Sequence, residues 1–87
     1  MTHHDTEIQA LLEQAVAQTY DAWSAAHPSL AAALDRITIQ DRAATRLRES
    51  DEYHQAIDAY HEARNETHFL NRLLDLAGVI LPTLMAG

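Results

Sequence analysis

The chain has 87 residues and no Cys, which excludes disulfides and thiolate metal sites as sources of stability. Apolar residues make up 47% of it, too large a share for a disordered protein. Its 13 acidic residues outweigh six Arg, and the net charge of −7 argues against nucleic acid and anionic membranes as partners.

The first predicted helix covers residues 7–26. Thr6 can cap it, and Gln9, three residues later, completes a capping box. Apolar side chains recur on one face at helical spacing: Ile8, Leu11, Leu12, Ala15, Val16, Thr19 and Trp23. The helix is expected to end before Pro28, because a residue that precedes proline is pushed out of the helical region. Residues 1–5 are expected to be a disordered terminus.

A second helical stretch is expected from Pro28 or Ser29 onward. No Gly or Pro follows until Gly78, so one helix, two or three are all allowed. A break near Thr38 has weak support. A break at Ser50 is better supported, because Ser caps helices and the two acidic residues after it suit a first helical turn.

A final long helix is expected from Asp51 to Leu76 or beyond, ending near Gly78 or Pro82. Its predicted buried face is Tyr53, Ala56, Tyr60, Ala63, Thr67, Leu70, Leu74 and Ala77. Towards the end of this helix the apolar side chains are too many for one stripe, which indicates burial on several sides. The apolar tail, residues 78–87, belongs to a run too short for a bilayer span of about 20 residues.

These elements predict an all-α protein: a helical hairpin or three-helix unit with a long C-terminal helix, completed as a bundle by self-association. A chain of this length buries only about 60–65% of the surface that its unfolded form exposes, so oligomerisation is the remaining source of stability. The predicted interface consists of aromatic and aliphatic anchors: Trp23, Tyr53, Tyr60, Leu70, Leu74 and Leu81. Docking of the tail into another protein, or onto a membrane, is the alternative.

Polar side chains form a narrow strip on the last predicted helix, at spacings of three and four: His54, Asp58, His61, Asn65, His68 and Arg72. Asp58 and His61 have a spacing similar to the Glu-x-x-His motif of ferritin-like bundles, which implies a divalent metal. The candidate ligands are His54, Asp58, His61 and His68. Glu13 or Asp21 of the first helix would complete the site. A solvated face is the simpler interpretation, and a pH-sensitive interface is the third.

Enzymatic and DNA-binding functions have little support in the sequence. No Ser or Cys nucleophile stands beside a base, and no Gly-rich phosphate loop occurs. Ala44, Leu47 and Ser50 have the spacing of a DNA-binding helix-turn-helix, which this segment loosely resembles. The helix that would read DNA, however, opens with Asp51 and Glu52, whose charges face phosphate.

The sequence therefore favours a non-enzymatic protein–protein interaction module, such as an adaptor, an inhibitor or an assembly subunit. The expected partner is a second copy of the chain, a dimer above all, or a protein with a basic surface. A metal-binding helical bundle is the rival hypothesis. The sequence shows no export signal, so a cytoplasmic location is expected.

Overall fold

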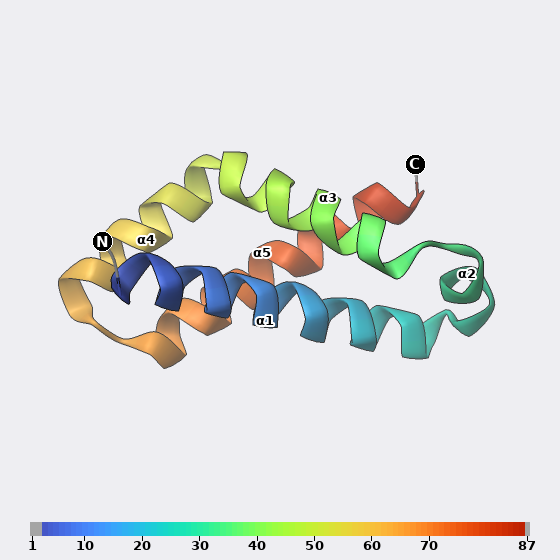
Figure 1. Ribbon diagram of the computed structural model, residues 1–87, viewed down its shortest axis with the longest axis horizontal. Helices are drawn as coiled ribbons and strands as arrows, with labels where there is room; N and C mark the ends of the chain where they lie inside the picture. Colours follow the sequence, from blue (N-terminus) through green and yellow to red (C-terminus); the bar gives the residue numbers. More distant parts are fainter. Residues whose placement is uncertain (1–2, 87) are drawn as a thin grey trace.

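The computed structural model describes residues 3–86, and within that range every regular element is an α-helix (Figure 1). The helices are α1 (His3–Ala26), α2 (Pro28–Ala33), α3 (Arg36–Glu49), α4 (Asp51–Ala63) and α5 (Glu66–Ala86). The all-α prediction is confirmed.

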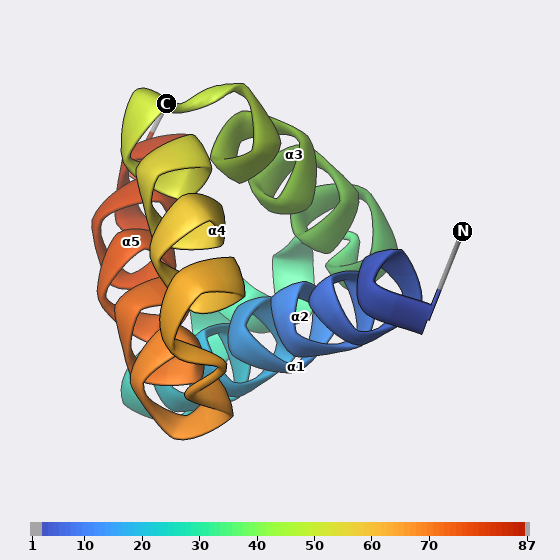
Figure 2. The ribbon, with the colours of Figure 1, turned by 90° about the vertical axis from the view of Figure 1, so that its left-hand side faces the viewer.

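The helices form an elongated bundle with three long sides. In Figure 1, α1 and α5 run in the same direction, and α3 and α4 together return along the bundle. Since Ser50 alone separates α3 from α4, these two helices form one bent arm. Viewed from its end, α1, α5 and this arm enclose a common interior (Figure 2). The Cα trace measures 42 × 21 × 20 Å.

The core lies within a single copy of the chain, and α5 is its central element because it packs against α1, α3 and α4. Buried side chains from α5 are Phe69, Leu73, Ala77, Leu81 and Met85. The other helices contribute Ile8, Leu12, Ala15, Val16, Tyr20, Ile39, Ala43, Leu47, Tyr53, Ala56 and Tyr60. One copy of the chain therefore buries this face of α5 without self-association.

Helix α1 starts earlier than the sequence indicated. It begins at His3, so Thr6 and Gln9 lie inside the helix and do not form its cap. The Gln9 side chain instead donates a hydrogen bond to Glu13, one turn further along. Residues 3–5, expected to be disordered, belong to α1, and residues 1–2 of that predicted terminus lie outside the described range.

The break after α2 lies at Leu34 and Asp35, and not near Thr38 as predicted. The Asp35 carboxylate caps α3, because its Oδ1 accepts hydrogen bonds from the N–H groups of Ile37 at 3.0 Å and Thr38 at 3.3 Å. Asp is among the strongest N-cap residues, and it places the start of α3 before Thr38.

The break at Ser50 is confirmed. The Ser50 hydroxyl accepts a hydrogen bond from the Tyr53 N–H at 3.1 Å and donates one to the Leu47 carbonyl at 2.8 Å. One side chain thus ends α3 and starts α4.

Replacing Ser50 by Ala removes both of these hydrogen bonds. We expect the free energy of unfolding to fall by about 1 kcal/mol, the usual cost of losing an N-cap. Urea unfolding followed by circular dichroism measures this change. Ser50→Asp is the control, since Asp also caps helices and should recover most of the loss; equal losses for the two variants would exclude capping as the cause.

The single long helix predicted after Asp51 is wrong, because the chain breaks between α4 and α5. Arg64 has a left-handed backbone with φ of 55° and ends α4. Asn65 Oδ1 then accepts a hydrogen bond from the His68 N–H at 3.0 Å, at the start of α5. The break changes the helical face that turns inward, so Ala63 and Thr67 are exposed and Phe69 is buried.

The predicted end near Gly78 or Pro82 is also wrong, because α5 continues through both residues to Ala86. Gly78 and Pro82 lie on the exposed side of the helix, whereas Leu81 and Met85 are buried. Burial of these two side chains offsets the hydrogen bond that Pro82 cannot donate.

Candidate functional site

The predicted polar stripe is divided between two helices by the break at Arg64. Its members are exposed at His54, Asp58 and His61 of α4, at the connecting Asn65, and at His68 and Arg72 of α5. Among residues 6–85, whose side chains the structure describes, no three His, Asp or Glu side chains are grouped so that they could hold a metal ion. The geometry thus gives no support to the predicted metal ligands.

The two carboxylates of α1 that were expected to complete a metal site have other partners. Glu13 accepts the hydrogen bond from Gln9 at 2.9 Å. Asp21 forms an ion pair with Arg36 of α3, with an N–O distance of 2.8 Å. Both members of this pair are at least half exposed, so it contributes little stability.

The six residues predicted to form an interface lie in two different environments. Tyr53, Tyr60 and Leu81 are buried in the core of the single chain. Trp23, Leu70 and Leu74 are partly buried and pack against that core. All six side chains are therefore used, wholly or in part, in packing within a single copy of the chain.

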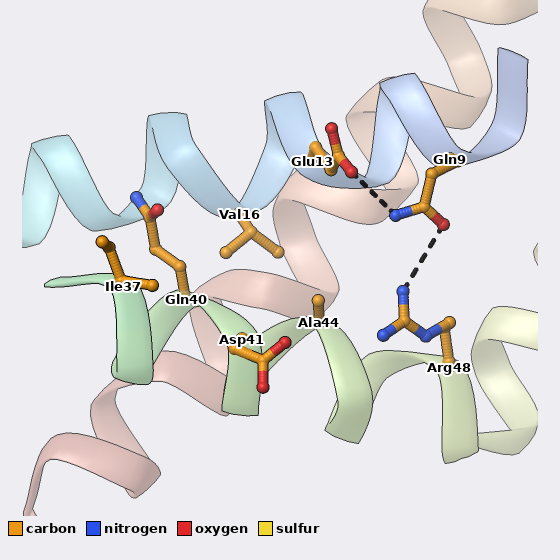
Figure 3. Close-up of a pocket in the computed structure, with 8 residues that line it drawn as sticks. All are labelled: Gln9, Glu13, Val16, Ile37, Gln40, Asp41, Ala44 and Arg48. Atoms are coloured by element: carbon orange, nitrogen blue, oxygen red, sulfur yellow. Dashed lines mark hydrogen bonds between the residues drawn. The ribbon is translucent and has the colours of Figure 1, made fainter. Parts of the chain in front are cut away.

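One groove, between α1 and α3, is polar. It has a volume of about 240 Å³ and is lined by Gln9, Glu13, Val16, Ile37, Gln40, Asp41, Ala44 and Arg48 (Figure 3). Gln9 of α1 accepts a hydrogen bond of 3.4 Å from Arg48 of α3. Its side chain also donates to Glu13 on its own helix. The bond between Arg48 and Gln9 joins α3 to α1. The Gln40 side-chain nitrogen is buried and has no hydrogen-bond partner among the described residues.

A second groove lies between α3 and α5 and consists of three adjoining hollows. We call it the α3–α5 groove. Its floor is apolar and comes from α5: Leu76, Val79, Ile80 and Leu84, with Thr83 beside them. Its rim is charged and comes from α3 and the first turn of α4: Asp41, Arg42, Arg46, Glu49 and Glu52, with Thr45 and Ser50. The largest hollow, beside Leu76, has a volume of about 510 Å³.

Val79 is the most exposed residue of this floor. Its side chain is 70% exposed, the highest value for a large apolar residue of α5. Leu76, Ile80 and Leu84 beside it are partly buried against the core. The floor is therefore a shallow apolar strip that the chain itself covers only in part.

The two arginines of the rim form no ion pair with the described residues. Among the described residues, neither Arg42 nor Arg46 has a carboxylate within ion-pair distance. Arg36 and Arg48, on other faces of α3, contact Asp21 and Gln9 of α1. The apolar floor lies in the apolar end of the last helix predicted from the sequence, whereas the charged rim was not predicted. The order of charges along α3 was the signal that could have identified it.

A buried hydroxyl ties α4 to the first turns of α1. The Tyr60 O–H donates to Glu7 Oε2 at 3.1 Å, and its ring stacks on Phe69 with 4.8 Å between the centroids. Burial raises the pKa of Tyr60, and the hydrogen bond to Glu7 and the charge of that carboxylate raise it further. Burial likewise raises the pKa of Tyr53.

These two tyrosines should make the fold sensitive to alkali. An unfolded Tyr ionises near pH 10, whereas the folded protein holds the protons on Tyr53 and Tyr60 to higher pH. Stability should therefore be unaffected by them below about pH 10 and fall as the pH rises above that value. Thermal unfolding between about pH 8 and pH 11 measures the slope. Tyr60→Phe should make the slope shallower; an unchanged slope would show that Tyr60 does not contribute.

Comparison of the sequence with models of known protein families found no match, and neither did comparisons with curated proteins or with solved structures. Within residues 3–86, no helix combines the length and the apolar character that crossing a bilayer requires.

Proposed function

We propose that this protein is a non-enzymatic protein–protein interaction module that acts as a homo-oligomer. The observation that supports the proposal is the partly covered apolar floor of the α3–α5 groove, with Val79 70% exposed at its centre. An apolar strip with a polar rim is the usual arrangement of a protein interface.

The dimensions of the bundle are suited to this role. A stable interface covers about 800 Å² on each partner. A bundle of 42 × 21 × 20 Å presents long faces of that order, and the α3–α5 groove lies along one of them. The small size of the chain adds a reason for association, because a second copy would add apolar contacts that one core of this size lacks.

The proposal is tested by the mass in solution, measured by light scattering over a wide range of protein concentrations. The wild-type protein should reach the mass of a dimer. Val79→Glu should remain a monomer at concentrations where the wild type has associated. Moving one carboxylate into an apolar contact costs several kcal/mol, which weakens association by about a hundredfold or more.

The matched control is Ile37→Glu. Ile37 is 79% exposed and lines the polar groove on the α1 side of α3, outside the proposed interface. This variant should associate as the wild type does. A wild-type protein that stays monomeric throughout would refute the proposal. Deletion of residues 78–87 is unsuitable as a test, because it would remove Leu81 and Met85 from the core.

A further inference from the structure

The α3–α5 groove carries its charges in a definite order along its length. At the Leu76 end, the rim consists of Glu49 and Glu52, with Arg46 reaching the same hollow. At the Leu84 end, the hollow is lined by four charged residues of α3: Asp41, Arg42, Arg46 and Glu49.

Two features locate the middle of the groove. Arg46 lines all three hollows, and Val79 and Ile80 line two of them. The most exposed part of the apolar floor therefore lies level with Arg46 and Glu49. Arg42 lies only at the Leu84 end and Glu52 only at the Leu76 end, whereas Arg46 and Glu49 line hollows at both ends.

From this order we infer that the groove is occupied by a second copy of this chain, in an antiparallel arrangement about a two-fold axis that passes near Val79. This inference rests on the proposed function and specifies its partner and geometry. A two-fold axis places each residue i opposite a residue j and the same j opposite i. The axis would bring Arg46 of each copy to Glu49 of the other, and Arg42 towards Glu52, with the two Val79 side chains meeting between them.

A second copy fits this rim better than an acidic helix from another protein does. Such a helix would be attracted to Arg42 and Arg46 and repelled by Glu49 and Glu52 over the rest of its length. A basic helix would be attracted to Glu49 and Glu52 and repelled by Arg42 and Arg46. Only a partner with the reverse order of charge satisfies both ends, and an antiparallel copy has that order. Two acidic residues also line the Leu84-end hollow: Glu49, which reaches both ends, and Asp41, which also lines the polar groove towards α1.

The test uses charge reversal in the full-length chain. In Arg46→Glu alone, and in Glu49→Arg alone, both cross-pairs become repulsive, so each variant should dimerise at least about tenfold more weakly than the wild type. When the two variants are mixed, every cross-pair is again between opposite charges. The mixture should therefore form heterodimers selectively, which native mass spectrometry resolves because the two chains differ in mass.

Two further proteins complete the design. The double variant Arg46→Glu/Glu49→Arg should dimerise with itself, since its cross-pairs are restored with the signs exchanged. Arg64→Glu makes the same change in charge at the α4–α5 connection, away from the groove, and should dimerise as the wild type does. All measurements belong at about 0.15 M salt, where the Debye length of about 8 Å screens the net repulsion between two acidic chains.

The outcomes separate this inference from the proposed function. A wild-type monomer at every concentration overturns both. A wild-type dimer whose two single variants show no preference for each other overturns the antiparallel arrangement and leaves the interaction module standing. Selective heterodimers, together with a self-associating double variant, support the inference.

Discussion

Leu73→Ala should destabilise the protein by about 2–5 kcal/mol, the range measured when a fully buried leucine leaves a cavity. Leu73 is completely buried and lies midway along α5, the helix that packs against α1, α3 and α4. A small domain has a total stability of only about 5–15 kcal/mol, so this one change removes a large fraction of it. Urea unfolding followed by circular dichroism gives the difference in free energy.

Val79→Ala is the control for this experiment. It also shortens an aliphatic side chain of α5, but Val79 is 70% exposed and a smaller side chain leaves no cavity in the core. Its effect on the monomer should stay within about 0.5 kcal/mol. The comparison is made at protein concentrations below the onset of association. Similar losses for both variants would contradict the core described for α5.

Pro82→Ala should stabilise the protein, by about 1–3 kcal/mol. Proline inside a helix lacks the N–H that would bond to the carbonyl four residues earlier, here that of Gly78, and its ring crowds that carbonyl. Pro82 is exposed, so alanine leaves the core unchanged. The thermal midpoint and the urea midpoint should both rise.

Gly78→Ala provides an independent check on the same part of the helix. A Cβ built on Gly78 has no neighbouring heavy atom within 4 Å, so alanine should be accommodated and should stabilise by up to about 1 kcal/mol. If the helix ended at Gly78 or Pro82, as the sequence alone suggested, neither substitution would stabilise the protein.

The local signals in the sequence identified one break in the chain and missed another. Ser50 is a strong capping residue followed by acidic side chains, and the break there is found as predicted. Arg64 gives no such signal, because arginine favours helices and rarely adopts a left-handed backbone, a role that glycine usually takes. Asn65, a good cap followed by Glu66, was the remaining indication of this break.

Tertiary packing determines where α5 ends and which of its residues are buried, and local sequence signals do not predict either. Helix α5 continues past Gly78 and Pro82 because Leu81 and Met85 are buried beyond them. Burial on several sides, expected from the excess of apolar residues after Leu70, is found only in part, because one row of this segment is fully buried while Val79 is 70% exposed. Which of those residues enter the core and which line the α3–α5 groove depends on how α5 packs against α3. Local sequence signals do not predict this packing.

The most extensive contact in the bundle joins its first long helix to its last. Because α1 and α5 are separated by the whole of α2, α3 and α4, their packing requires closure of a large loop, which slows folding relative to neighbouring contacts. During synthesis, α1 must therefore remain without its main partner until residues 66–86 have left the ribosome. Until then, the part of the apolar face of α1 that packs against α5 should remain uncovered.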